Sequence, residues 1–303
     1  MQILLLGTAA GGGFPQWNCW CPSCRVARAD PRAAVPRTQS SVAVSADGLH
    51  WFLLNASPDV REQLARLPVS DPIGARRVPI EGVVLTDAEL DHTVGLLLLR
   101  EAGRLPIYAT PAVVEMLENG SHILPVTRAF ADIPVTLLAL GHPVPLTTRE
   151  GADAGLTVEA FEVPAGPPRF APAAGVGHTV GVIIRDTAAG SSAAYVPGCG
   201  ELDDALLGRL GTADLLLFDG TFWTDRELID LGISDRTARE MDHLAISGPG
   251  GSLERISALH CRHRVYTHIN NSNPLLVERG PERAVVERAG VLVGEDGMAF
   301  TLV

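Results

Sequence analysis

The feature that most constrains the fold of this chain is an alternation of short apolar strands with helices that occurs in two regions. Strand patterns at 80–85 and 105–110 are each followed by a helix pattern, and the alternation returns at 214–220 and 264–270. Consecutive strand patterns separate the two regions. Such alternation favours two sheets packed face to face with helices outside, although the pattern alone leaves other α/β layouts open. No fixed repeat or low-complexity linker divides residues 1–303, which we expect to form a single domain.

Three further segments carry specific expectations. The apolar run at 93–103 predicts one helix that ends near Gly103. The Pro- and Ala-rich segment 164–176 is expected to be a surface or lid loop instead of a domain boundary. The glycines at 11–13 lack a following nucleotide-binding pattern, so we expect a tight loop near the site that allows close approach of the backbone.

The charge of the chain excludes several classes of partner. The formal net charge is −11 at pH 7, and no cluster of Lys and Arg offers a surface for nucleic acid or an anionic membrane. The first residues lack the basic segment of a signal peptide, and no stretch approaches the ~20 apolar residues of a membrane span. We therefore expect a soluble cytoplasmic protein that binds neither nucleic acid nor membrane.

Polar residues crowd the segment between the strand at 80–85 and the next helix. Asp91 and His92 lie there, and a purely structural interpretation makes Asp91 a helix cap and His92 a polar surface residue. However, His268 directly follows an apolar strand near the end of the chain, and Asp219 closes another. Since strand ends along one edge of a sandwich converge, several such residues together favour a shared site.

The order of these motifs resembles a known superfamily. A glycine-rich loop after the first strand, TDAELDH after a middle strand and YTHIN near the end are similar to the metallo-β-lactamase superfamily over essentially the whole chain. More narrowly, GGGFPQWNCWCPSC, DAELDHTVGLLLLRE and YTHINNSNPLL resemble the coenzyme PQQ synthesis protein B family. The resemblance implies a four-layer αββα sandwich with a metal site at the sheet edge.

The first metal of that superfamily has lost its ligands in this chain. The loop of the superfamily reads Thr-His-x-His-x-Asp-His, and Asp87 and Glu89 replace its first two histidines. The positions of the mid-chain histidine and the bridging aspartate hold 164–166 (Pro-Ala-Gly) and 197–199 (Pro-Gly-Cys). His178 is the nearest histidine to the mid-chain position, but it comes about a dozen residues late and is a poor replacement.

The ligands of the second metal remain as Asp91, His92 and His268. Two histidines and one carboxylate with open positions are typical of non-haem Fe(II) oxygenases, and Zn²⁺ accepts the same ligands. The residues therefore predict a mononuclear metal site, and the ligand set favours Fe(II).

The resemblance also implies a reaction. The family acts in making pyrroloquinoline quinone (PQQ) from a Glu–Tyr pair, and it is associated with iron- and O₂-dependent hydroxylation of the tyrosine ring of a small-molecule intermediate. Asp87 and Glu89 would then support the metal ligands or accept ring protons. Asp219 and His243 would orient ligands or substrate, and Arg169 is a candidate partner for substrate carboxylates.

Two other functions stay open from the sequence. One is a mononuclear zinc hydrolase, which the lost ligands disfavour. The other is a non-catalytic carrier or transport factor for PQQ or its precursor, because loss of ligands is also what decay of activity would produce. Other PQQ-pathway proteins are possible partners, and a homodimer is plausible on general grounds.

A second candidate metal site is the segment NCWCPSC. Cys19, Cys21 and Cys24 bring three thiols within a few residues, and structural Zn²⁺ takes four S or N ligands in a tetrahedron. The alternatives are three reduced thiols or one oxidised pair. We expect a structural zinc, and we expect Cys199 and Cys261 to be buried thiols.

The fourth ligand of this zinc is not set by the cysteine spacing. Related phosphodiesterases of the superfamily use a histidine three residues after the late active-site histidine, and that position holds Asn271 here. Its amide oxygen, a water molecule, His263 and Cys261 are the alternatives. We favour Asn271, because it would tie the cysteine loop to the edge that carries His268.

Overall fold

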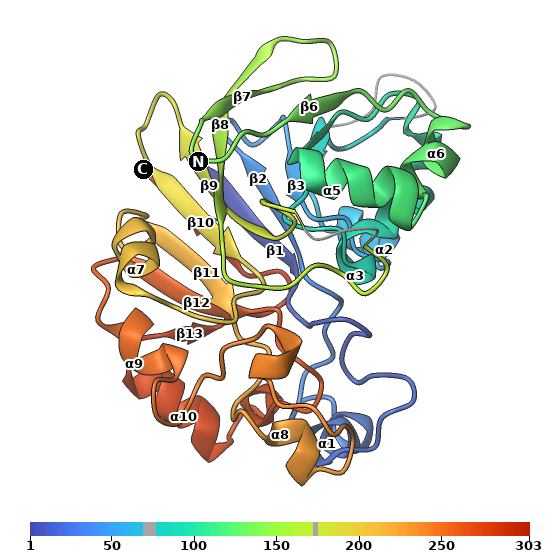
Figure 1. Ribbon diagram of the computed structural model, residues 1–303. Helices are drawn as coiled ribbons and strands as arrows, with labels where there is room; N and C mark the ends of the chain where they lie inside the picture. Colours follow the sequence, from blue (N-terminus) through green and yellow to red (C-terminus); the bar gives the residue numbers. More distant parts are fainter. Residues whose placement is uncertain (69–76, 172–174) are drawn as a thin grey trace.

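Two sheets form the centre of the computed structural model, which describes residues 1–68, 77–171 and 175–303. Among these residues each sheet has seven strands (Figure 1). The first sheet, in spatial order, contains β14 (Ala299–Thr301), β1 (Gln2–Gly7), β2 (Ser41–Ser45), β3 (Phe52–Leu54), β4 (Gly82–Val84), β5 (Ile107–Ala109) and β6 (Val135–Leu137). The second contains β13 (Leu292–Val293), β12 (His263–Thr267), β11 (Leu215–Asp219), β10 (Ser192–Val196), β9 (Val180–Asp186), β8 (Asp153–Glu162) and β7 (Val144–Thr147).

Helices cover the outer face of each sheet (Figure 1). The α-helices are α1 (Pro22–Ala29), α2 (Val60–Leu64), α3 (Leu90–Thr93), α4 (Gly95–Leu98), α5 (Pro111–Glu115), α6 (Ile123–Arg128), α7 (Asp204–Leu210), α8 (Glu227–Asp230), α9 (Ser252–Ser257) and α10 (Pro281–Arg288). Short turns of other helix types are η1 (Arg100–Ala102), η2 (Met116–Gly120), η3 (Arg239–Met241) and η4 (Pro274–Leu276). None of the described helices has the length and hydrophobicity that crossing a membrane requires.

The apolar residues form three buried clusters that match these layers. Val84 and Tyr195 lie in the cluster between the two sheets. Leu96 packs with the outer face of the first sheet, and Ile256 packs with the outer face of the second. Burial of apolar surface on both faces of both sheets is what stabilises four layers. The four-layer αββα sandwich that the sequence motifs predicted is confirmed.

The strand directions bring several loops to one edge of the sandwich. Strands β3, β4, β5 and β6 are parallel, and so are β10, β11, β12 and β13. The carboxyl ends of parallel strands lie on the same side of a sheet, so the loops that follow them are neighbours. Polar residues after β4, β11 and β12 therefore meet at a single edge.

The expectation of one helix over 93–103 was wrong. The chain forms α3, α4 and η1 in succession, and the break lies before Gly95. The N–H of Gly95 donates to the carbonyl of Ala56 (2.9 Å), and the N–H of Ala56 donates to the carbonyl of His92 (2.7 Å). These two contacts replace helical hydrogen bonds and fix the backbone of His92 against the end of β3.

Several short elements were absent from the sequence prediction, namely α1, α6, α8 and β7. Helix α8 has four residues and β7 has four, which is too short for a periodic pattern to emerge. The segment 164–176 has no helix or strand in its described part, as expected of a loop, and residues 172–174 lie outside the described residues.

Candidate metal centre

The predicted site residues come from the carboxyl ends of strands in both sheets. Asp91 and His92 lie in α3, which follows β4, and His268 directly follows β12. Asp219 is the last residue of β11, and His243 lies in the loop between η3 and α9. The strands are held by their ladders and by buried apolar side chains, so the loops that carry these residues start from fixed points.

Asp91, His92 and His268 converge on one point. The Nε2 atom of His268 lies 3.3 Å from Oδ2 of Asp91, and Nε2 of His92 lies 3.8 Å from the same oxygen. One ligand atom from each residue lies within 4.8 Å of the others. His92 is buried, and its Nε2 atom has no hydrogen-bond partner. A buried nitrogen without a partner is costly, and a metal ion satisfies it, so these residues fit a metal ion.

A buried carboxylate holds the ring of His92 in place. Nδ1 of His92 lies 2.8 Å from both oxygens of Asp87. Asp87 also accepts from the hydroxyl of Thr86 (2.7 Å) and from the N–H of Glu89 (2.9 Å). When Nδ1–H donates to a carboxylate, the lone pair of Nε2 is left to bind a metal ion. Asp87 therefore lies behind the histidine, where it orients a ligand.

These carboxylates also shift the pKa values of the ligands in the metal-free site. Burial opposes ionisation of His92, but the charges of Asp87 and Asp91 outweigh it and raise the pKa of His92 to about 9. Burial would raise the pKa of Asp91, yet the charges of His92 and His268 hold it well below its usual range. A metal ion must displace the proton of His92 when it binds.

Asp219 supports two histidines. Its Oδ2 atom lies 2.7 Å from Nδ1 of His243 and accepts from the N–H of Cys199 (3.1 Å). Its Oδ1 atom accepts from the hydroxyl of Thr221 (2.5 Å), and this hydroxyl lies 2.9 Å from Nδ1 of His268. Asp219, His243 and His268 also offer ligand atoms within 4.8 Å of one another. Because hydrogen bonds occupy both Asp219 oxygens, we favour the Asp91 group as the metal site.

A cavity of about 340 Å³ opens in front of these ligands. Its wall includes Gly11, Phe222 and Met241 beside the acidic residues Glu89 and Asp242, and no Lys or Arg occurs among its described lining residues. A Cβ on Gly11 would lie 3.3 Å from Oδ2 of Asp91, so the glycine loop approaches the site closely, as expected. Desolvation and the charges of Asp87 and Asp91 raise the pKa of Glu89 to about 7.

Two residues from the sequence analysis lie elsewhere. Arg169 is exposed and does not line the cavity. His178 does not line it either: its Nε2 atom lies 2.8 Å from the carbonyl oxygen of Ala165, and its Nδ1 atom contacts the carbonyl of Gly175. His178 thus supports the loop that forms one wall of the cavity. The role of carboxylate partner proposed for Arg169 has no support from its position.

Thr221 and Phe222 line the cavity but were not predicted from the sequence. Thr221 comes two residues after Asp219, and this position next to a strand end is the signal by which it could have been found. Phe222 belongs to an irregular loop, where no periodic pattern distinguishes a lining residue.

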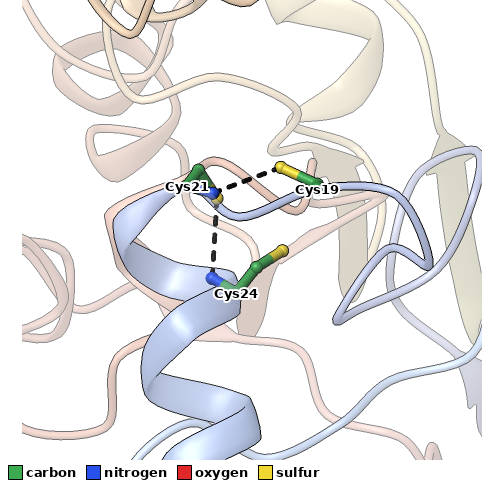
Figure 2. Close-up of side chains that lie close together, drawn as sticks. All are labelled: Cys19, Cys21 and Cys24. Carbon is green, nitrogen blue, oxygen red and sulfur yellow. Dashed lines mark hydrogen bonds between the residues drawn. The ribbon is translucent and has the colours of Figure 1, made fainter.

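The three clustered cysteines also come together (Figure 2). The thiol sulfur of Cys19 accepts from the N–H of Cys21 (3.5 Å), and that of Cys21 accepts from the N–H of Cys24 (3.5 Å). The three sulfurs lie within 4.8 Å of one another, and all three thiols are free. Burial raises the pKa of Cys21 to about 12, so a metal ion must displace a tightly held proton.

Of the candidates for a fourth ligand, the structure brings Asn271 to the cysteines. Its side-chain Nδ2 atom lies 3.4 Å from the sulfur of Cys24, and its backbone carbonyl oxygen lies 3.4 Å from the sulfur of Cys21. The sulfur of Cys261 instead contacts the carbonyl of Leu210 at 3.4 Å. His263 packs on the ring of Phe300, with ring centroids 5.2 Å apart.

Cys199 and Cys261 are buried, as expected of these two thiols. The sulfur of Cys199 lies 2.9 Å from the carbonyl oxygen of Glu201. Neither thiol belongs to the cysteine cluster among the described residues.

Comparison with known proteins identifies the family. A sequence model of the beta-lactamase superfamily domain matches residues 50–269. Coenzyme PQQ synthesis protein B of Gluconacetobacter diazotrophicus is 44% identical over 309 residues, covering 99% of each chain, and that of Cupriavidus taiwanensis is 44% identical over 310 residues with 99% coverage of each. The crystal structure of Zn²⁺-bound PqqB from Methylobacterium extorquens matches with a TM-score of 0.89 at 39% identity over 100% of both chains. The chain therefore belongs to the coenzyme PQQ synthesis protein B family of the beta-lactamase superfamily.

Proposed function

We propose that this chain acts in PQQ biosynthesis as a non-haem iron hydroxylase. Its substrates would be O₂, a two-electron reductant and a small tyrosine-derived PQQ intermediate. One oxygen atom would enter a C–H bond of the tyrosine ring as a hydroxyl group, and the reductant would supply the electrons that convert the other to water. The observation that carries the proposal is the group of Asp91, His92 and His268 at the head of a cavity. Two histidines and one carboxylate are the ligand set of Fe(II) oxygenases, and the family membership supplies the pathway.

Each residue of the site has a role in this proposal. Asp91, His92 and His268 would hold Fe(II), which when bound supplies the chemistry that O₂ activation needs. Asp87 keeps the ring of His92 oriented through its 2.8 Å contact with Nδ1. Hydroxylation removes a proton from the ring, and Glu89 is the cavity carboxylate next to the ligands that would accept it.

His243 and Asp219 have a positioning role in the proposal. The ring of His243 stacks on that of His268, with centroids 5.6 Å apart and an angle of 23° between the planes. Its Nδ1 atom lies 2.7 Å from Asp219, so the ring faces the cavity in a fixed orientation and can orient a substrate. Phe222 packs edge-on against the same ring at 5.8 Å and limits the entry of water.

We also propose that Cys19, Cys21 and Cys24 bind a structural zinc, with Asn271 as the fourth ligand. Three sulfurs within 4.8 Å of one another support the zinc site, and the side chain of Asn271 lies beside them, with Nδ2 3.4 Å from the sulfur of Cys24. Its amide oxygen is the atom that would bind the ion, because an amide NH₂ group is only a donor. A thiolate site of this kind favours Zn²⁺ over harder cations.

A second candidate function is a mononuclear zinc hydrolase. The observation that favours it is the Zn²⁺-bound state of the relative from Methylobacterium extorquens. The same two histidines and one carboxylate would accept Zn²⁺. The two candidates differ in whether O₂ is consumed.

The test is a count of metals per chain after anaerobic reconstitution, followed by turnover with O₂. We expect iron and zinc together in the natural chain, and His92→Ala should lose the iron, keep the zinc and lose O₂ consumption. His142→Ala is the control, because His142 is exposed and lies outside the cavity. With ¹⁸O₂, the ¹⁸O label should appear in the hydroxyl group that is added to the ring of the product.

Three results would count against the hydroxylase. Iron that remains bound in His92→Ala would show that the ligands are misassigned. Turnover with Zn²⁺ and without O₂ consumption would favour the hydrolase. A chain that binds the intermediate and leaves it unchanged with either metal would be a carrier for PQQ or its precursor.

A further inference from the structure

The three histidines of the site are held at Nδ1 in two different ways. His92 and His243 each have a carboxylate oxygen directly at Nδ1, at 2.8 Å from Asp87 and 2.7 Å from Asp219. Nδ1 of His268 lies 4.0 Å from Oδ1 of Asp219, which is too far for a hydrogen bond. Instead, Nδ1 of His268 lies 2.9 Å from the hydroxyl oxygen of Thr221.

The hydrogen bonds around Thr221 determine which atom carries the proton. A hydroxyl has one proton to donate. The Thr221 oxygen lies 2.5 Å from Oδ1 of Asp219 and 3.0 Å from the carbonyl of His268. Asp219 also accepts from the N–H groups of Thr221 and Cys199, which are the surroundings of an ionised carboxylate. The carboxylate is the stronger and closer acceptor, so the Thr221 hydroxyl donates to Asp219.

The direction of this hydrogen bond determines the direction of the hydrogen bond between Thr221 and His268. Since its proton is used, the Thr221 oxygen accepts from His268, and His268 must carry its proton on Nδ1. The Nε2 atom of His268 is then the nitrogen that faces the metal site, where it shares a 3.3 Å hydrogen bond with Oδ2 of Asp91 while no metal ion is bound. A neutral imidazole binds a metal through the nitrogen that lacks the proton.

Burial makes the hydroxyl hard to replace. Thr221 is 3% exposed, Asp219 is 0% exposed and His268 is 6% exposed, so the side chains that these hydrogen bonds link are buried. The backbone of Thr221 is tied to the same carboxylate by its own N–H (3.0 Å). Thr221 therefore holds Asp219 and His268 at a set separation.

We propose that Thr221 is a positioning residue whose hydroxyl links Asp219 to His268 and fixes the tautomer that presents Nε2 of His268 to the metal. The inference rests on the proposed metal site and does not depend on the reaction that occurs there. It also assigns Asp219 a double role, because one carboxylate orients His243 directly and His268 through Thr221.

The first test measures metal affinity. Thr221→Val keeps the shape of the side chain and removes the hydroxyl, whereas Thr221→Ser keeps the hydroxyl. With the cysteine site filled by Zn²⁺, Fe(II) is titrated anaerobically against a chelator. We expect Thr221→Val to bind Fe(II) about 10–100-fold more weakly, the usual effect of losing such a supporting hydrogen bond, and Thr221→Ser to bind as the natural chain does. Equal affinity in Thr221→Val would overturn the proposal.

The second test reads the tautomer itself with diamagnetic Zn²⁺ in the proposed site, because in the metal-free protein Nε2 of His268 also has Asp91 as a hydrogen-bond partner. Two-bond ¹H–¹⁵N spectra distinguish Nδ1–H from Nε2–H rings, and His268→Gln assigns the signals of His268. We expect the Nδ1–H form in the natural chain and in Thr221→Ser, and a shift towards Nε2–H in Thr221→Val. An Nε2–H ring in the natural chain would refute the link.

The two tests separate this inference from the proposed function. If His268→Gln binds Fe(II) as tightly as the natural chain, the proposed metal site fails, whatever the tautomer of His268. If His268 is needed for Fe(II) and Thr221→Val changes neither the affinity nor the tautomer, only the role of Thr221 fails.

Discussion

At the scale of single residues, Gly95 has no room for a side chain. A Cβ there would lie 2.3 Å from the carbonyl oxygen of Ser57 and 2.6 Å from that of Ala56. Both are backbone atoms, which cannot rotate away. The same backbone contact includes the hydrogen bond from Ala56 to the carbonyl of His92.

We expect Gly95→Ala to destabilise the fold by about 3 kcal/mol or more, because the added methyl group has no space. It should also weaken metal binding, because His92 moves with its carbonyl. Chemical denaturation and a metal titration measure the two effects. Gly208→Ala is the matched control: Gly208 lies inside α7 with nothing within 4 Å of its Cβ position, so we expect a gain of ~0.5–1 kcal/mol. Similar stability in both variants would contradict the packing argument.

A local sequence pattern predicts a site residue only where the position of that residue next to a strand or helix is enough to place it. Asp91 and His268 were identified because polar residues at the ends of apolar strands share an edge. Thr221 was not, because its position next to a strand end indicates only where it lies, and its role depends on a contact with His268, 47 residues further along. Arg169 was selected for its charge alone, and its exposed position shows that charge does not locate a side chain.

At the scale of elements, Glu227 joins α8 to the segment that follows β12. Its carboxylate accepts from the N–H of Trp223 (2.6 Å) and from the hydroxyl of Ser272. Burial raises the pKa of Glu227 to about 7, against an ordinary value of 4.5. The protonated form is therefore the one that the fold accommodates at lowest cost.

This shift predicts a pH dependence of stability. The stabilisation that comes with the raised pKa is fully present below pH ~4.5 and is lost as the pH rises to ~7, because only the unfolded chain releases the proton in that window. Glu227→Gln should remove this component, which amounts to about 2–4 kcal/mol between pH 5 and pH 8. Denaturation at both pH values measures it, and Glu254→Gln, at an exposed glutamate of α9, should leave it unchanged. An unchanged pH dependence in Glu227→Gln would contradict the argument.

The helix expected over 93–103 shows where element prediction fails. Apolar spacing predicted the helical residues and the end near Gly103, where φ is 72°. It missed the break, because the hydrogen bonds of Ala56 that cause it come from a loop distant in the sequence. The break fixes the backbone of His92, one of the proposed metal ligands.

At the scale of the whole molecule, the cysteine cluster connects a segment near the N-terminus with one in the C-terminal part of the chain. The sulfur of Cys24 contacts the side chain of Asn271, and α1 packs into the same buried cluster as Leu275 and Val286 near the C-terminus. A metal ion at the cysteines would hold these distant segments together and stabilise the folded state only.

We expect Cys24→Ser to lose zinc and to lower Tm on the order of 5–10 °C, since zinc binding is coupled to folding. Cys261→Ser, at a buried thiol outside the cluster, should keep the full zinc content. Elemental analysis and thermal unfolding with and without a chelator measure both effects. A chelator that leaves the Tm of the natural chain unchanged would argue against a structural zinc.

The short segment after β12 belongs to both proposed metal sites, because His268 faces Asp91 and Asn271 reaches the cysteines three residues later. The two ions would therefore be allosteric effectors of each other. Thermodynamic reciprocity requires that the factor by which zinc tightens iron binding equals the factor by which iron tightens zinc binding. In a cell short of zinc, this protein would then lose iron as well, although the supply of iron had not changed.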